Sequence, residues 1–202
     1  MLKSLTLTAF AAFALLTFAL PAQAAEVGKP APDFTGTDTH GNTHKLSDYK
    51  GKLVVLEWTN PGCPFVKKHY ESNNMQGLQE KYTAKDVVWL SVNSSADGKQ
   101  GNMTPEEANK LIEEQGIKST AYLLDPEGEI GKLYDAKTTP HMFVVDKDGV
   151  LAYAGAIDSD DSFKPEAIAG ATNYVAAALD ALAEGKLVEV SNTKSYGCSV
   201  KY

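Results

Sequence analysis

The sequence predicts an α/β fold with a central mixed β-sheet flanked by helices, in a chain of 202 residues. Two apolar runs rich in β-branched residues, 53–56 and 87–92, are typical of buried strands in a parallel sheet. A third apolar strand, 141–145, directly follows a Thr-Pro pair and leads into an Asp-Gly hairpin turn. Helix start signals separate these strands, and the length suffices for one domain with a sizeable core.

The chain is organised around the junction between the first of these strands and a helix. The segment Asn60-Pro61-Gly62 ends the strand, because proline fixes φ and glycine permits backbone geometry that other residues resist. Cys63 follows at once, and Pro64 suits the first position of a helix. Since a helix N-terminus stabilises a thiolate, we predict that Cys63 is a reactive thiol. The alternative is a buried cysteine that acts as a small apolar residue.

The first 24 residues have the pattern of a secretory signal peptide. Lys3 supplies a positive start, the segment 5–20 is apolar, and Pro21-Ala22-Gln23-Ala24 ends in an Ala-x-Ala cleavage pattern. The apolar run is short for a membrane anchor and lacks a positive flank behind it. We therefore expect cleavage after Ala24, export to a bacterial periplasm and no stable membrane insertion afterwards. The predicted organisation is a signal peptide (1–24), a domain (25–188) and a C-terminal tail (189–202).

The remaining elements are expected in chain order. A hairpin turns at Gly41-Asn42, and a helix over 65–82 has a kink at Asn73-Asn74. Thr104-Pro105-Glu106-Glu107 carries the cap, proline and acidic residues of a helix start. The other predicted elements are a helix to Gln115, a strand at 122–124, a helix at 125–134, a hairpin over 141–154, an alanine-rich helix at 164–185 and a strand-like segment at 187–190.

Two features of the sequence are similar to the thioredoxin superfamily. One is the cysteine that follows a central strand and opens a helix, and the other is Thr139-Pro140 before an apolar strand. The pattern G-x-x-A-P-D-F with L-S-D-Y-K-G-K before the central strand resembles the redoxin branch, which includes alkyl hydroperoxide reductase and the thiol-specific antioxidant proteins. The resemblance covers about residues 27–157. It implies a thioredoxin-like fold with an N-terminal β-hairpin extension and a C-terminal tail.

The resemblance also implies roles for three residues. Pro140 is expected to be cis and to lie beside Cys63, which leaves the backbone of Thr139 free to pair with an incoming thiol or peptide. Glu57 lies six residues before Cys63, where thioredoxins carry a buried acid that moves protons. Glu57 has two interpretations, a proton-transfer group or a hydrogen-bonding group that holds the loop. Val66 stands where thioredoxins have their second cysteine, so any resolving thiol must come from elsewhere.

Cys198 is the only other cysteine of the chain. In an exported protein a disulfide persists. A bridge between Cys63 and Cys198 would close a long loop, which would stabilise the fold by roughly 5 kcal/mol. Three readings stay open: a redox-active pair in which Cys198 resolves an intermediate on Cys63, a structural bridge, and two unpaired thiols.

A peroxide pocket of the usual peroxiredoxin type is not expected. That pattern places proline, threonine and cysteine as P-x-x-x-T-x-x-C and uses a distant arginine, whereas this chain has no arginine. Thr59, Asn60 and Lys68 are candidates to replace those groups. Lys68 and His69 lie about one and a half helical turns after Cys63. They would either lower the pKa of the thiol or form a solvated helix face.

The charge of the chain limits its partners. The net charge is −7, and every basic residue is a lysine, so a nucleic-acid partner is not expected. No histidine pair has the spacing of a closed zinc site, and we expect no metal and no cofactor. The expected partner is a protein thiol or disulfide or a small hydroperoxide, with an external reductant that no motif identifies.

These observations predict an exported thiol-redox enzyme, in which Cys63 reduces a disulfide or a hydroperoxide and Cys198 resolves the intermediate. A second enzymatic interpretation is an envelope thiol–disulfide oxidoreductase without peroxidase activity. A non-enzymatic interpretation is a binding module in which Cys63 and Cys198 form a permanent bridge. The reduction potential of a Cys63–Cys198 disulfide distinguishes the redox interpretations from the structural one, because structural disulfides have potentials below roughly −300 mV.

Overall fold

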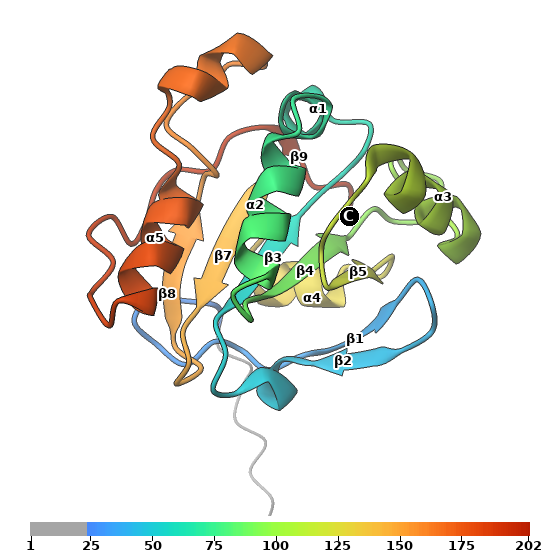
Figure 1. Ribbon diagram of the computed structural model, residues 1–202. Coiled ribbons are helices and arrows are strands. Elements are labelled where there is room, and N and C mark those ends of the chain that lie inside the picture. Colours follow the sequence, from blue (N-terminus) through green and yellow to red (C-terminus); the bar gives the residue numbers. More distant parts are fainter. Residues whose placement is uncertain (1–23) are drawn as a thin grey trace, which may run out of the picture.

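The computed structural model describes residues 24–202, so the predicted signal peptide lies outside the described residues except for Ala24. A seven-stranded mixed sheet with the order β2-β1-β5-β4-β3-β7-β8 forms its centre (Figure 1). Its strands are β1 (Thr35–Asp38), β2 (Thr43–Lys45), β3 (Val54–Trp58), β4 (Val88–Asn93), β5 (Ala121–Leu124), β7 (His141–Val145) and β8 (Leu151–Gly155). The predicted α/β fold is confirmed.

The strands at the centre of the sheet have the expected direction and burial. β3 runs parallel to β4 and antiparallel to β7, and every residue of these three strands is buried. Parallel strands that are covered on both faces read as continuous apolar runs, which is the pattern in the sequence. Glu57 is the charged exception within β3.

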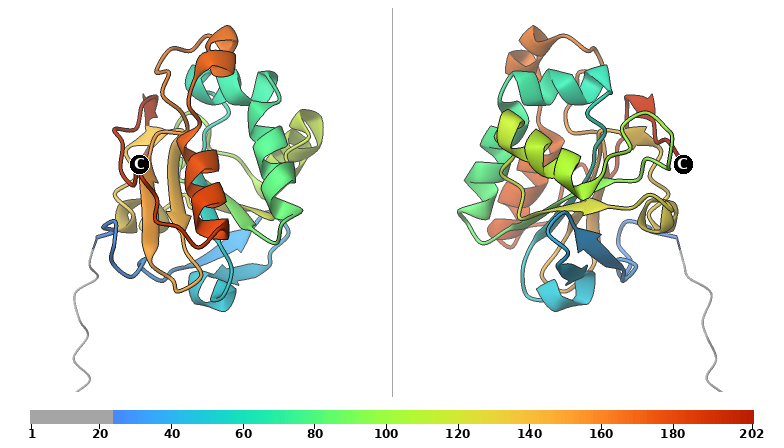
Figure 2. Two further views of the ribbon diagram at one scale, coloured as in Figure 1. Left: turned by 60° about the vertical axis from the view of Figure 1, so that its left-hand side comes forward. Right: turned by 90° about the vertical axis from the view of Figure 1, so that its right-hand side faces the viewer.

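Helices cover the two faces of the sheet (Figure 2). The helices α1 (Pro64–Glu71), α2 (Asn74–Thr83) and α5 (Tyr174–Ala183) share one apolar cluster with the side chains of Val55, Trp89 and Val144. On the other face, α4 (Glu129–Leu133) and the 3-10 helix η1 (Leu46–Tyr49) pack on Leu56, Leu90 and Phe143. None of the helices in residues 24–202 combines the length and apolar character needed to cross a membrane.

Several local predictions are confirmed. β1 and β2 form the expected hairpin, and Asp146–Gly149 turns between β7 and β8. Helix α3 (Pro105–Gln115) begins with a capping box between Thr104 and Glu107 and ends at Gly116 in the left-handed conformation. These elements are set by short-range chemistry, namely turn residues, caps and a terminal glycine.

The helix predicted over 65–82 is wrong as a single kinked helix, because the chain forms two helices. Asn73 has φ 57°, a left-handed conformation that asparagine tolerates better than most residues, and it starts α2 in a new direction. Ser72 Oγ donates to the carbonyl of Lys68 at 2.7 Å, which competes with continuation of the helix.

Two predictions in the C-terminal part are also wrong. The segment 164–185 is not one helix, since a 3-10 helix η2 (Pro165–Gly170) ends before α5, which Asn173 caps by accepting from the N–H of Ala176 at 2.8 Å. The segment 187–190 is not a strand, and Leu187 is 94% exposed. An apolar run without a sheet edge to pair with does not form a strand.

The tail instead makes its contacts further along. The N–H of Thr193 donates to the carbonyl of Ala154 at the outer edge of β8 at 3.1 Å. Beyond it, the short strand β9 (Cys198–Ser199) pairs antiparallel with β6 (Thr138–Thr139) as a separate two-stranded sheet. Figure 1 shows β9 at the end of the sheet where α1 begins.

Candidate active site

Cys63 lies at the junction between β3 and α1, as the sequence predicts. It is the N-cap of α1 with extended backbone angles, and Pro64 is the first helical residue. Its N–H donates to the carbonyl of Asn60 at 3.0 Å, which closes the turn that ends β3. Cys63 therefore lies at the N-terminus of α1, the end of the helix with the unpaired N–H groups.

The sulfur of Cys63 is buried beside the Thr-Pro segment. Cys63 is 0% exposed, and its Sγ donates to the carbonyl oxygen of Thr139 at 3.0 Å. The peptide bond between Thr139 and Pro140 is cis, as the resemblance implied. In this arrangement the buried thiol of Cys63 is inaccessible to a bulky reagent.

Cys198 lies against the same segment from the opposite side. In the pairing of β6 with β9, Cys198 is opposite Thr139 and Ser199 is opposite Thr138. Cys63 and Cys198 are both free thiols, and the half-buried Cys198 packs against the apolar cluster that contains Cys63. The expectation that the backbone of Thr139 is free for a partner is therefore wrong, because the tail of the same chain occupies it.

The tail is fixed on both sides of Cys198. A Cβ on Gly197 would come within 2.0 Å of the Thr139 carbonyl oxygen, so only glycine permits this close approach. Hydrogen bonds after Cys198 join Val200 N to Lys137 O at 3.1 Å, Ala96 N to Lys201 O at 2.8 Å and Tyr202 Oη to Ala136 O at 2.9 Å. The tail is thus an ordered part of the fold in this structure.

The two thiols have pKa values shifted in opposite directions. Burial raises the pKa of Cys63, but the neighbouring side chain of Cys198 and the backbone N–H groups of Cys198 and Val66 outweigh burial and lower it. Burial and the neighbouring Cys63 raise the pKa of Cys198 to about 11. The arrangement therefore favours a thiolate on Cys63 and a proton on Cys198, which fits a nucleophile and its resolving thiol.

Glu57 is fully buried and accepts four hydrogen bonds. The donors are Tyr70 Oη at 2.7 Å to one carboxylate oxygen, and Trp89 Nε1 at 2.7 Å, Gln79 Nε2 at 3.0 Å and Ser91 Oγ at 3.2 Å to the other. Burial raises its pKa in spite of these donors. None of these hydrogen bonds reaches Cys63, and the donors tie β3 to α1, α2 and β4.

Lys68 and His69 are buried rather than on a solvated helix face. Lys68 is 1% exposed, and its Nζ donates to the carbonyl of Asp160 at 2.7 Å. His69 Nε2 lies 3.2 Å from the hydroxyl of Tyr196 and 4.0 Å from a carboxylate oxygen of Asp158. The loop at 158–160 and the tail cover this helix face, and the sequence holds no local signal of that coverage.

The candidate replacements for a peroxide pocket have structural contacts. Asn60 is buried, and its amide donates to Ser95 Oγ at 3.2 Å and to the carbonyl of Gln100 at 2.9 Å. The N–H of Thr59 donates to the carbonyl of Val92 at 2.9 Å, which extends the pairing of β3 with β4. Asn60 thereby holds the turn before Cys63 against the loop at 94–103.

Sequence reasoning missed Asp158 and Tyr196, which pack beside the cysteine helix. The signal available was the position of Tyr196, two residues before Cys198. It also missed the four donors to Glu57, which come from three separate elements, α1, α2 and β4. Only the folded chain brings such residues together.

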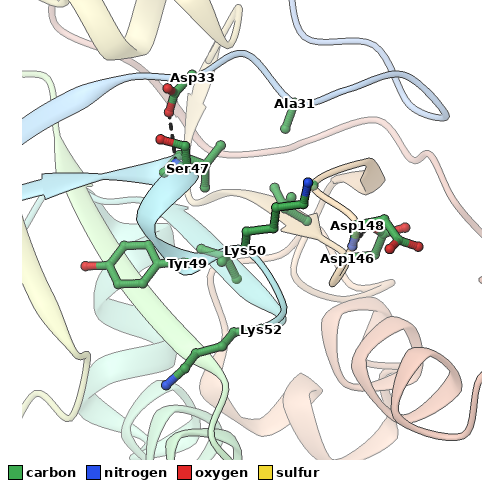
Figure 3. Close-up of a pocket in the computed structure, with 12 residues that line it drawn as sticks. Ala31, Asp33, Ser47, Tyr49, Lys50, Lys52, Asp146 and Asp148 are labelled. Carbon is green, nitrogen blue, oxygen red and sulfur yellow. Dashed lines mark hydrogen bonds between the residues drawn. The ribbon is translucent and has the colours of Figure 1, made fainter.

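A cavity of about 200 Å³ lies far from the thiols. It is bounded by Val54 at the start of β3 and Val145 at the end of β7, whereas Cys63 follows the other end of β3. Figure 3 shows Lys50 and Lys52 at this cavity, with Asp33 accepting from the N–H of Ser47 at 2.9 Å. Within residues 24–202, no group of three or more histidine, cysteine, aspartate or glutamate side chains is arranged to hold a metal ion.

Several known proteins that this chain resembles are thiol-redox proteins. The chain is 32% identical over 124 residues to the thiol-disulfide oxidoreductase ResA of Bacillus thuringiensis subsp. konkukian, covering 61% of this chain and 66% of that protein. It is 28% identical to the peroxiredoxin Bcp of Bacillus subtilis, covering 53% of this chain and 83% of that protein. The chain thus matches slightly less than two thirds of the length of that ResA protein.

A solved structure extends the similarity over most of the chain. An uncharacterized conserved protein from Geobacillus kaustophilus has 33% sequence identity and a TM-score of 0.74, covering 88% of this chain and 92% of that one. Residues 27–154 match the AhpC/TSA family, and this range includes β3 and Cys63. With the cis proline beside Cys63, the fold is that of the thioredoxin superfamily, and the chain belongs to the AhpC/TSA family.

Proposed function

We propose that this protein is an exported thiol-redox enzyme in which Cys63 is the nucleophile and Cys198 resolves the intermediate. One observation carries the proposal: Cys63 and Cys198 meet at Thr139, with the Cys63 sulfur 3.0 Å from the Thr139 carbonyl and Cys198 opposite the same residue. Two cysteines far apart in the sequence thereby form a pair at a helix N-terminus, where thiolates are stabilised.

With a hydroperoxide, the Cys63 thiolate attacks the terminal oxygen and the O–O bond breaks. Cys63 becomes a sulfenic acid, and the departing alkoxide takes a proton and leaves as an alcohol, or as water from hydrogen peroxide. The Cys198 sulfur then attacks the Cys63 sulfur, the S–O bond breaks, and the hydroxide leaves as water with the Cys198 proton. Two equivalents of an external thiol reduce the resulting disulfide.

With a disulfide, the Cys63 thiolate attacks one sulfur and the other leaves as a thiolate. Cys198 then attacks the Cys63 sulfur of the mixed disulfide and releases the second thiolate. The similarity to ResA and the lack of arginine favour this thiol–disulfide oxidoreductase alternative, whereas the similarity to Bcp favours the peroxidase. Protein thiols or disulfides are the proposed partners in this second case.

The sequence features before and after the domain complete the proposal. The apolar run and the Ala-x-Ala pattern support residues 1–24 as a signal peptide for export to the periplasm. We propose 25–188 as the redox domain and 189–202 as the tail that contributes Cys198. N-terminal sequencing of the exported form should begin at Ala25, and an intact Met1 would overturn this part.

Intact mass and free-thiol counts test the chemistry. The reduced protein is treated with a few equivalents of hydrogen peroxide or of hydroxyethyl disulfide, and afterwards with dithiothreitol. The proposal expects two thiols that become one internal disulfide and return with the reductant. In Cys198→Ser, peroxide should leave a sulfenic acid on Cys63, which dimedone traps.

The other outcomes distinguish the alternatives. Oxidation by hydroxyethyl disulfide without reaction toward peroxide supports the oxidoreductase. A bridge that resists reduction to below roughly −300 mV supports a structural staple. Thiols that react with neither reagent contradict every redox version of the proposal.

A further inference from the structure

We propose that Tyr196 is a positioning residue that holds Cys198 against Cys63. The inference rests on the proposed function, because it concerns the resolving step of the same cysteine pair. Tyr196 lies two residues before Cys198, and its hydroxyl enters a polar cluster with residues of α1, the first residue of α2 and the loop after β8. This cluster consists of Lys68, His69, Asn74, Asp158 and Tyr196.

The hydrogen bonds of this cluster have a defined direction. The Asn74 amide donates to Nδ1 of His69 at 2.8 Å, so the ring hydrogen of the neutral histidine is on Nε2. Nε2 therefore donates to the hydroxyl oxygen of Tyr196 at 3.2 Å, and that hydroxyl donates to Oδ1 of Asp158 at 2.6 Å. The phenol is the link that connects helix α1 to Asp158.

Lys68, His69 and Asp158 at the centre of the cluster are buried, which makes the loss of a hydrogen bond among them costly, whereas Asn74 and Tyr196 are half-buried. His69 is 0% and Asp158 3% exposed, and the second carboxylate oxygen of Asp158 has no hydrogen-bond partner among residues 24–202. The first oxygen accepts from the hydroxyl of Tyr196 and from the N–H of Asp160 at 3.1 Å, and the ammonium of Lys68 lies 3.9 Å from it. Buried carboxylates depend on such donors, so the hydroxyl is held firmly in place.

The anchor and the nucleophile share one rigid element. Cys63 caps the first turn of α1, and the same helix carries His69 and Phe65, whose ring centroid lies 5.9 Å from that of Tyr196. Only Gly197 stands between Tyr196 and Cys198, and it packs directly on the Thr139 carbonyl. Because α1 holds the tail through Tyr196, it also fixes the distance between Cys198 and Cys63.

The consequence is a high effective concentration of Cys198 at Cys63. Two groups held in contact react as if one were present at a very high concentration, and freedom of the tail reduces this advantage. Without the Tyr196 hydroxyl, the tail keeps its anchors after Cys198 and the contacts of Thr193 with Ala154 and Ala156, but it loses the hydrogen bonds nearest to Cys198 on the preceding side. Formation of the Cys63–Cys198 disulfide should become less favourable, whereas the thiolate chemistry of Cys63 with an outside reagent does not need the tail.

The test is the equilibrium of the Cys63–Cys198 disulfide with glutathione in Tyr196→Phe. We expect about a tenfold lower effective concentration, which is a reduction potential about 30 mV less negative than that of the wild type. Tyr174→Phe is the matched control. Tyr174 and Tyr196 line one surface cavity, but the hydroxyl of Tyr174 makes no hydrogen bond within residues 24–202, whereas that of Tyr196 donates to Asp158. The control should keep the wild-type potential.

A potential is informative because a general loss of stability does not by itself change it in a folded protein. If Tyr196→Phe does not fold, Asp158→Asn tests the same link, because it keeps the shape of the acceptor but removes its charge. A wild-type potential in the folded variant overturns the inference. Failure of the wild-type protein to form the disulfide at all overturns the proposed function instead, so the two failures are distinguishable.

Discussion

The backbone of Thr139 pairs with the backbone of Cys198, and this contact decides which groups can reach Cys63. A thioredoxin-like site would offer Thr139 to an incoming chain, but here the tail of the protein itself fills the position. Cys63 is completely buried beneath it, whereas Cys198 is half-buried. A polypeptide that pairs with Thr139 must first displace the tail.

Gly197→Ala should loosen this contact. The Cβ would lie 2.0 Å from the Thr139 carbonyl oxygen, and the φ of 126° is strained for alanine. We expect the free energy of unfolding to fall by about 1–3 kcal/mol, the usual cost of such backbone strain, and the tail to move away from Thr139. Urea unfolding measures the first effect, and the rate of Cys63 alkylation by iodoacetamide, read by peptide mass spectrometry, should rise.

Gly170→Ala is the control for this prediction. No atom lies within 4 Å of a Cβ on Gly170, so this variant should keep the stability and the alkylation rate of the wild type. Equal alkylation of Cys63 in Gly197→Ala and the wild type would contradict the view that the tail covers Cys63.

Glu57→Gln should destabilise the protein strongly. Four donors point at the carboxylate, and the amide group of glutamine would place an N–H against at least one of them. A buried donor left without an acceptor costs about 1–3 kcal/mol, so we expect urea unfolding to show a loss of at least about 2 kcal/mol. Glu80→Gln, an exposed change on α2, is the control and should be neutral.

The same variant separates the two interpretations of Glu57. A hydrogen-bonding role predicts lost stability with an unchanged pH profile of Cys63 alkylation in the protein that remains folded. A stable variant would contradict the hydrogen-bonding role. A stable variant with a shifted profile would instead favour proton transfer to or from Cys63.

The parts of the site that were predictable depend on short-range chemistry. The strand, the Asn60-Pro61-Gly62 turn and the helix N-terminus at Cys63 follow from residues next to one another in the sequence. The helix start at Thr104 and the turn at Asp146–Gly149 have the same origin. In these segments the local preference of the chain and the final packing agree.

The parts that were not predictable depend on contacts between distant segments. Lys68 and His69 have the sequence pattern of a solvated helix face. No residue near them in the sequence indicates that Asp158 and Tyr196 cover them in the folded protein. The sequence predicts a kink at Asn73, but the structure has a break. The stabilisation from packing α2 on the sheet offsets the cost of a left-handed residue and permits a new helix direction. Tertiary packing thus overrides local preference in both places.

The stability of the protein should fall in moderately acid solution because of His69. Burial and the charge of Lys68 lower the pKa of His69 to about 3, whereas an unfolded histidine has a pKa near 6.5. Between these values the unfolded chain binds a proton that the folded protein does not, so the free energy of unfolding falls as the pH falls from about 6.5 to 3.

Urea unfolding at pH 7 and pH 4.5 measures this effect. In His69→Gln the loss between the two pH values should be smaller than in the wild type by about 1–2 kcal/mol. The exposed His40 provides the control, and His40→Gln should keep the wild-type dependence. Identical pH dependence in His69→Gln and the wild type would contradict a neutral, buried His69.

A second pH effect should arise at the β1–β2 hairpin from Asp38. Burial alone would raise the pKa of Asp38, but hydrogen bonds from His44, Asn42 and the N–H of His40 lower it to about 2. The unfolded value is 3.8, so the stabilisation is present above about pH 4 and is lost as the pH falls toward 2.

Asp38→Asn should therefore cost about 2 kcal/mol at pH 7 and much less at pH 2.5. Thermal unfolding at both pH values gives the comparison, with Asp48→Asn as the exposed control. A cost of Asp38→Asn that is equal at both pH values would show that the carboxylate charge does not stabilise the hairpin.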